Sequence, residues 1–157
     1  MNLKTTLPLS AANTIVEAAL AAAREAGLAP LTVVVLDTGG QLKAMSREDG
    51  CGIMWFEVAM AKSWGALGMG VNTRLMRQRF QERPTFQASL AAASDGRFAA
   101  VPGGVLIQDA DGYTIGSVGI SGDASDKDEY CAIVGIKAAG LTPDPAEPVE
   151  NWNGAGL

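Results

Sequence analysis

A single lysine lies in a stretch of the chain that is otherwise almost entirely apolar. Between Met54 and Met69 the only charged residues are Glu57 and Lys62, so apolar residues surround nearly the whole of the helix that this segment predicts. A lysine in such a place has to reach solvent along its side chain, pair with a carboxylate or lose its proton. Lys62 is therefore a candidate for binding a carboxylate or for acid–base or Schiff-base chemistry, and pairing with Glu57 is the structural alternative.

Two acidic neighbours, Asp128 and Glu129, lie at the start of the last predicted helix, just after the bend Ser121-Gly122-Asp123. A carboxylate in a first turn can act as a base if it faces a pocket, and the free N–H groups of a helix start favour a bound anion. The structural alternative is a capping box that pairs Ser125 with Asp128 or Asp126 with Glu129. The candidate catalytic residues are Lys62, Asp128 and Glu129.

Two further segments carry groups that suit an anionic or flat ligand. In Pro102-Gly103-Gly104, glycines without side chains can expose backbone N–H groups, although the tight start of a strand needs the same residues. Arg47 can clamp a carboxylate through two N–H groups, and a surface pair with Glu48 or Asp49 is its alternative. Four arginines between residues 74 and 83 are expected to form a solvated or inter-subunit face. The predicted ligand-binding residues are Arg47, Asp49, Lys62, Pro102, Gly103, Gly104, Ser121 and Gly122.

The absence of histidine narrows the chemistry most. It removes the commonest general base, transition-metal ligand and axial ligand of heme, and it excludes a Ser-His-Asp or Cys-His mechanism. Cys51 and Cys131 are far apart, so we expect reduced thiols and no metal site. A net charge of −5 without a basic stripe argues against nucleic-acid binding. We predict a cytoplasmic protein, since the sequence shows no signal peptide and no apolar run of about 20 residues that would span a membrane.

Apolar periodicity and turn residues predict the order helix, hairpin, helices, hairpin, helix. Leu31 to Leu36 is a continuous apolar run, which is typical of a strand buried on both faces. Thr73 is expected to cap the third helix, and Ser125 or Asp126 the last one. The predicted helices cover residues 11–26, 54–69, 74–81, 85–93 and about 126–139, and the predicted strands cover residues 31–36, 41–47, 105–108 and 113–121.

These elements predict an α+β fold in which helices flank a single layer of antiparallel sheet made of two β-hairpins. The segment DTGGQL turns between two strands instead of starting a helix, which excludes a parallel dinucleotide-binding sheet. A length of 157 residues fits a single domain, which we place at residues 1–141. Residues 142–157, which hold three of the seven prolines, are expected to form an irregular tail whose Trp152 docks on a neighbouring surface.

Three blocks of sequence follow one another in a specific order. They read VVVLDTGGQLKAMSREDG, AMAKSWGALGMG and VPGGVLIQDADGYTIGSVGISGDASDKDEYCAIVGI. From about Ser10 to Leu141 the chain thereby resembles the GlcG/HbpS-type heme-binding family, which includes the C-terminal domain of PduO-type proteins; the family pattern also has a lysine at the position of Lys62. The resemblance implies a profilin-like fold, a homo-oligomer (a tetramer or an octamer) and, in some members, heme as a cofactor. Where a histidine holds the iron in the family, this chain offers only methionine, cysteine, tyrosine or lysine, or contacts to the face and propionates of the porphyrin.

Three functions are compatible with these features. The first is a small-molecule-binding protein whose pocket, lined by Lys62 and the glycine turns, holds heme or another flat or anionic metabolite. The second is an enzyme with isomerase- or lyase-type acid–base chemistry on a small carboxylated or phenolic metabolite. The third is a structural or interaction module. The first two require Lys62 and the two glycine bends to line the same hollow.

Overall fold

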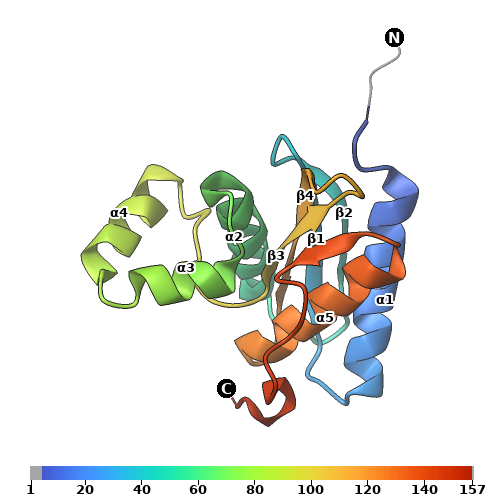
Figure 1. Ribbon diagram of the computed structural model, residues 1–157. Helices are drawn as coiled ribbons and strands as arrows, with labels where there is room; N and C mark the ends of the chain where they lie inside the picture. Colours follow the sequence, from blue (N-terminus) through green and yellow to red (C-terminus); the bar gives the residue numbers. More distant parts are fainter. Residues whose placement is uncertain (1–4, 157) are drawn as a thin grey trace.

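Five antiparallel strands form one open sheet in the computed structural model, which describes residues 5–156 (Figure 1). The strands lie in the order β2-β1-β4-β3-β5, so β1 and β4 join the two hairpins at the centre of the sheet. The predicted α+β fold with a single antiparallel sheet is confirmed. The strands are β1 (Thr32–Asp37), β2 (Leu42–Arg47), β3 (Gly104–Gln108), β4 (Thr114–Ser121) and β5 (Thr142–Asp144).

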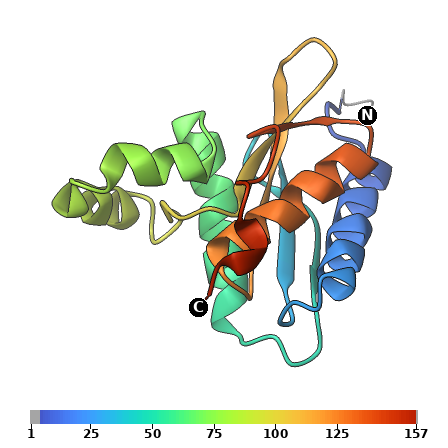
Figure 2. The same cartoon turned by 60° about the horizontal axis from the view of Figure 1, so that its bottom comes forward.

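Helices cover both faces of the sheet. α1 (Leu9–Glu25) and α5 (Ser125–Ala138) pack together on one face, and α2 (Met54–Met69) lies on the other. α3 (Thr73–Phe80) and α4 (Pro84–Ala93) form an arm that extends away from the sheet beyond α2, as Figures 1 and 2 show. None of the described helices is long and apolar enough to cross a membrane.

The central strand β1 is covered on both sides. Val33 and Val35 belong to the core formed with α1 and α5, whereas Val34 and Leu36 pack against α2. All four side chains are completely buried, as the continuous apolar run predicts. Each contributes on the order of 1.5–3 kcal/mol relative to an exposed position, which makes β1 the centre of both cores.

α2 comes close to β4 because the strand presents small residues to it. Gly119 faces the carbonyl of Ala59, and a Cβ atom built at position 119 would overlap that oxygen. Nearby, the hydroxyls of Ser63 and Ser117 lie 2.6 Å apart, and Ser117 also donates to the Ser63 carbonyl at 2.9 Å. This contact fixes α2 on the sheet and directs Lys62 toward the end of β4.

The cap of α3 differs from the prediction. Asn72, and not Thr73, caps the helix, and its side chain accepts the N–H of Leu75 at 2.9 Å. The hydroxyl of Thr73 instead accepts the N–H of Gly104 at 2.8 Å. Thr73 therefore ties the arm to the start of β3, which a local sequence pattern does not reveal.

α5 starts without a side-chain cap. Ala124 is its N-cap residue, so the predicted cap at Ser125 or Asp126 is wrong, and so is the capping box. The two acids of the predicted box, Asp128 and Glu129, bind cations of α2 and α3 instead. They connect α5 to other helices, and Asp128 also accepts the N–H of Asp123 just before its own helix.

Part of the tail that the sequence predicts to be irregular belongs to the sheet. β5 pairs with the outer edge of β3, where Ile107 lies opposite Pro143. A proline is tolerated there because β5 is an edge strand. Figure 2 shows the tail returning along α5 to the end where that helix starts. Trp152 of η1 (Trp152–Gly154) stacks on Tyr130 with ring centroids 3.6 Å apart, which confirms the predicted docking.

Adding one methyl group between α2 and β4 should destabilise the protein. Gly119→Ala is expected to lower the free energy of unfolding by about 1–3 kcal/mol, because the new Cβ atom forces the helix off the strand. Gly154→Ala is the matched control, since a Cβ atom there meets nothing within 4 Å, and it should change stability by less than about 0.5 kcal/mol. Urea denaturation measures both, and equal effects would contradict the close helix–strand contact.

Candidate functional site

A lysine and an aspartate form an ion pair that protein encloses on nearly all sides. Lys62, near the middle of α2, is 1% exposed, and Asp128, in α5, is fully buried. The ammonium nitrogen of Lys62 donates to Asp128 Oδ2 at 2.7 Å and to the Ile120 carbonyl at 2.9 Å. Asp128 Oδ1 accepts the N–H of Asp123 at 3.2 Å. The pair therefore joins α2, the end of β4 and α5 at one point.

The bend Pro102-Gly103-Gly104 packs directly against this ion pair. A Cβ atom at Gly103 would lie 2.9 Å from the Lys62 nitrogen and 3.1 Å from the Cβ atom of Asp128. A Cβ atom at Gly104 would overlap the backbone carbonyl of Lys62. The bend thus makes room for the lysine. The N–H of Gly104 is already bound to Thr73, so it is not available to a ligand.

Burial changes the protonation of the two buried acids of α5, Asp128 and Glu129. Loss of hydration raises the pKa of Asp128 to about 6, although the Lys62 ammonium and the N–H of Asp123 oppose the rise. Burial also raises the pKa of Glu129, and the Arg74 guanidinium opposes that rise. A carboxyl group with a pKa of about 6 exchanges its proton near neutral pH, which suits general acid–base chemistry.

A cavity of about 310 Å³ opens beside the ion pair. Its volume lies at the lower end of the range of about 300–1,000 Å³ that is usual for small-molecule pockets. The lining residues are Trp55, Val58, Lys62, Val101, Ser121, Asp123, Ala124, Ser125, Asp128 and Gly156. A second hollow of about 420 Å³ adjoins it, because it shares Val101, Ala124, Ser125 and Gly156 and extends to Arg77.

The structure brings together most of the predicted residues of the two glycine bends. Lys62, Asp128 and Ser121 line the cavity, and the bend at residues 102–104 lies against the lysine. Gly122 is not a lining residue, and its backbone packs so closely on Pro30 and Leu31 that a side chain would not fit. The binding and enzyme hypotheses require both bends to line the hollow with Lys62, and this is met only in part. Of the bend residues predicted to bind a ligand, only Ser121 lines it, and the glycines pack behind it.

Arg47 and Asp49 lie apart from this group. The guanidinium of Arg47 donates to the Cys51 carbonyl at 2.7 Å, and neither Arg47 nor Asp49 is among the residues that line the cavity. Lys62 pairs with Asp128 across the fold and not with Glu57, which is exposed on its own helix. The partner of Lys62 is therefore set by tertiary packing, which the neighbouring sequence does not reveal.

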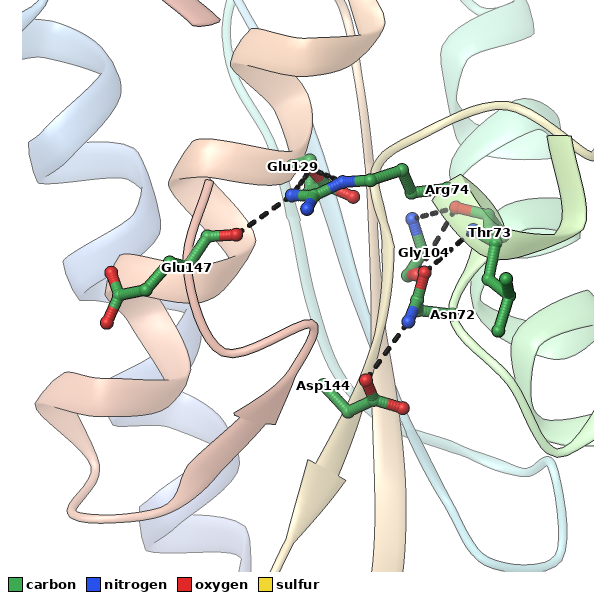
Figure 3. A network of polar contacts seen from close by, with 8 residues as sticks. Asn72, Thr73, Arg74, Gly104, Glu129, Asp144 and Glu147 are labelled. Carbon is green, nitrogen blue, oxygen red and sulfur yellow. Dashed lines mark hydrogen bonds and ion pairs between the residues drawn. The ribbon is translucent and has the colours of Figure 1, made fainter. Parts of the chain in front are cut away.

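Glu129 belongs to a second polar network, which Figure 3 shows between α3, α5 and the tail. Its Oε1 accepts from Arg74, whereas its buried Oε2 has no hydrogen-bond partner among the described residues. Arg74 also donates to the Glu147 carbonyl at 2.9 Å, and Asn72 donates to Asp144 at 3.0 Å. Glu129 lines neither hollow, and Arg74 links it to Glu147 of the tail, whose last described residue, Gly156, lines both hollows.

Sequence reasoning missed the apolar wall of the cavity. Trp55 and Val58 precede Lys62 by seven and four residues, so helical spacing places them on the same face of α2, and this spacing was the available signal. Val101 directly precedes the predicted bend. Gly156 reaches the cavity only through the pairing of β5 and the stacking of η1 on α5, for which the local sequence carries no pattern.

Metal binding and thiol chemistry have no support in the described part of the chain. Within residues 5–156 no three histidine, cysteine, aspartate or glutamate side chains are grouped so that they could hold a metal ion. Cys51 and Cys131 are free and buried. Burial raises the pKa of Cys131 to about 12, so this thiol stays protonated and unreactive at neutral pH.

A family model described as "Haem degrading protein HbpS-like" matches residues 7–137. The chain belongs to this HbpS-like family. The matched span contains Lys62, both glycine bends and Asp128, and it stops before the tail. The resemblance found in the sequence is therefore confirmed at the level of the family.

Solved structures share the fold. The crystal structure of HbpS has a TM-score of 0.73 at 28% identity, and the alignment covers 87% of this chain and 92% of that one. The crystal structure of the PduOC:heme complex has a TM-score of 0.77 at 24% identity, with 86% and 96% covered. The Klebsiella pneumoniae protein ORFY has a TM-score of 0.78 at 21% identity, with 89% and 94% covered. No curated protein sequence matches the chain significantly.

Removing one partner of the ion pair should be costly. Lys62→Met leaves the carboxyl group of Asp128 buried without its cation, and we expect the free energy of unfolding to fall by about 3–5 kcal/mol. The double variant Lys62→Met/Asp128→Leu should recover most of that loss, because it leaves neither charge in the interior. Urea denaturation at neutral pH measures the series. A double variant less stable than Lys62→Met would refute this account.

The raised pKa of Asp128 predicts a pH dependence of stability. Since its folded-state pKa of about 6 lies above the ordinary value of 3.8, the folded protein binds this proton more tightly than the unfolded chain. The stabilisation that comes from this tighter proton binding is fully present below pH 3.8. It is lost as the pH rises through the folded-state pKa of about 6. The stability of the wild type relative to Asp128→Asn should therefore fall between about pH 4 and about pH 7. Urea denaturation of both proteins across this range tests it, and a constant difference would show that burial does not raise this pKa.

Proposed function

We propose that this chain binds a small polar metabolite in the cavity beside Lys62 and Asp128. The observation that carries the proposal is a buried ion pair that borders an open space. Such a pair adds little stability, because the loss of hydration offsets the attraction between the charges. Two charged groups kept from bulk water yet in reach of a cavity are typical of functional sites.

The residues around the cavity do not fit a heme whose iron is held by one of their side chains. The lining contains no histidine, cysteine, methionine or tyrosine. The nitrogen of Lys62 is already committed as a donor to a carboxylate and a carbonyl. The family description names haem, and a protein of this fold holds heme in the PduOC complex. For this chain we nevertheless propose a smaller, polar occupant.

A second candidate is an enzyme that moves a proton on the bound molecule, and the protonation of Asp128 favours it. With a pKa of about 6, Asp128 can give or take a proton near neutral pH. The Lys62 ammonium, 2.7 Å away, can then stabilise the negative charge that develops on the carboxylate or on the ligand. Binding and catalysis use the same cavity and differ in whether the molecule leaves unchanged. The homo-oligomer and the cytoplasmic location expected from the sequence stay predictions.

Filling the cavity should abolish binding. Val101 borders both hollows and is 39% exposed, so Val101→Trp places a large ring in the space without disturbing the core. Tyr113→Trp, at a position that is 72% exposed beyond the second hairpin turn, is the matched control. Native mass spectrometry after incubation with a cell extract should show a bound small molecule on the wild type and on the control, and none on Val101→Trp. A bound mass that persists in Val101→Trp would rule out this cavity.

The wild type, Val101→Trp and Tyr113→Trp also show whether the ligand is heme. A hemin titration followed at the Soret band should give no saturable change that depends on position 101. If the wild type and the control show a saturable shift that Val101→Trp removes, heme is the occupant and the polar ligand is wrong. The mass of the molecule before and after incubation distinguishes binding from turnover.

A further inference from the structure

The two hollows at the start of α5 have different chemistry at their far ends. Lys62 and Asp128 line only the smaller one, and Arg77 of α3 lines only the larger one, so we call these parts the Lys62 end and the Arg77 end. Ala124 and Ser125 line both hollows. A ligand that occupies the adjoining hollows therefore meets a single cation at one end and an ion pair at the other.

The end at Arg77 favours a negative group. The guanidinium of Arg77 forms no hydrogen bond or ion pair with the rest of residues 5–156. The N–H groups of Ser125 and Asp126 likewise find no acceptor in the part of the chain that the structure describes. These donors and the positive end of the α5 dipole attract an anion. Because the carboxylate of Asp126 also borders this hollow, a single negative charge is balanced better than the double charge of a phosphate.

The end at Lys62 favours a neutral polar group. Lys62 and Asp128 neutralise each other, and Asp123, which also lines this hollow, pairs with Lys127 at 3.2 Å, so these groups attract no further charge. An ammonium has three N–H donors, and Lys62 uses two of them, on Asp128 and on the Ile120 carbonyl. Ser121 lines the cavity and is 2% exposed, and its hydroxyl forms no hydrogen bond with the residues that the structure describes. Because Ser121 borders the cavity, a ligand there can supply a hydrogen-bond partner for its hydroxyl.

We infer that the ligand is a small monocarboxylic acid that carries a neutral hydroxyl or carbonyl group. Its carboxylate lies between Arg77 and the N–H groups at the start of α5. Its neutral group accepts from Lys62 and bonds with Ser121. The inference rests on the proposed function and adds to it the chemical class of the ligand.

The test compares acids with their uncharged amides. Lactate, hydroxybutyrate and hydroxybenzoate, each beside the corresponding amide, are titrated into isotope-labelled full-length protein, and the backbone N–H signals are followed by NMR. At least one acid should shift the Ser125 and Asp126 signals saturably, and its amide should bind at least about tenfold more weakly. Arg77→Gln should lower the affinity for the acid by about tenfold or more. Arg79→Gln, which removes an exposed arginine of the same helix that lines neither hollow, should leave the affinity unchanged.

Each other outcome overturns the inference, and the first three of them leave the proposed function standing. Equal binding of acid and amide, or equal affinities of the Arg77→Gln and Arg79→Gln variants, would mean that the cavity binds without recognising a carboxylate. Stronger saturable shifts with inorganic phosphate than with the acids would mean that the site prefers a doubly charged anion to a monocarboxylate. If no probe shifts the signals of any lining residue, the ligand class is wrong, and the Val101→Trp experiment decides separately whether the cavity binds at all.

Discussion

The contact between Lys62 and Asp128 links the two helical layers of this protein through one pair of charges. α2 and α5 lie on opposite faces of the sheet, and the lysine reaches past the end of β4 to the aspartate on the other side. Both groups lose nearly all of their hydration in doing so, and their mutual attraction has to offset that loss. This charged contact joins α2, the end of β4 and the first turn of α5 at one point.

The site depends as much on missing side chains as on those present. Gly119 lets the backbone of α2 lie against β4, and Gly103 leaves space for the ammonium of Lys62. Gly103 also has a φ of +114°, which other residues rarely adopt. Ser63 and Ser117 pair in the same contact and fix the height of the helix on the strand. The glycine bends thus act as structural supports of the cavity, and the polar groups that face it come from α2, from the end of β4 and from α5.

Local patterns predicted the fold well because most of its elements are locally determined. The apolar segment from Met54 to Met69 is the helix observed, and each hairpin turn joins the strands that its residues indicate. The strand at Thr142–Asp144 was missed, because a three-residue edge strand with a proline has little pattern of its own and forms only against β3.

The site was predicted in part for the same reason. Lys62 stood out because a charge in an apolar helix is a local anomaly. Its partner Asp128, 66 residues away, was expected to close a helix cap, since sequence neighbours cannot show which distant cation a carboxylate meets. Arg47 has the right chemistry for a ligand, but the loop holds it on the Cys51 carbonyl. Residue type indicates what a group can do, and only packing decides whether it faces the cavity.

The two adjoining hollows are lined by parts of the protein that differ in local stability, because one of these parts belongs to the arm of α3 and α4. The arm has a small core of its own around Met76, Phe80 and Ala100, and α4 contributes no buried residue. Segments with so little buried apolar surface open locally at a lower free energy than a sheet packed on both faces. Arg77 is carried by the arm, whereas Lys62 is fixed on the sheet. We expect the residence time of a ligand to be set by excursions of the arm, so that changes in its small core alter dissociation without touching a residue at the ion pair.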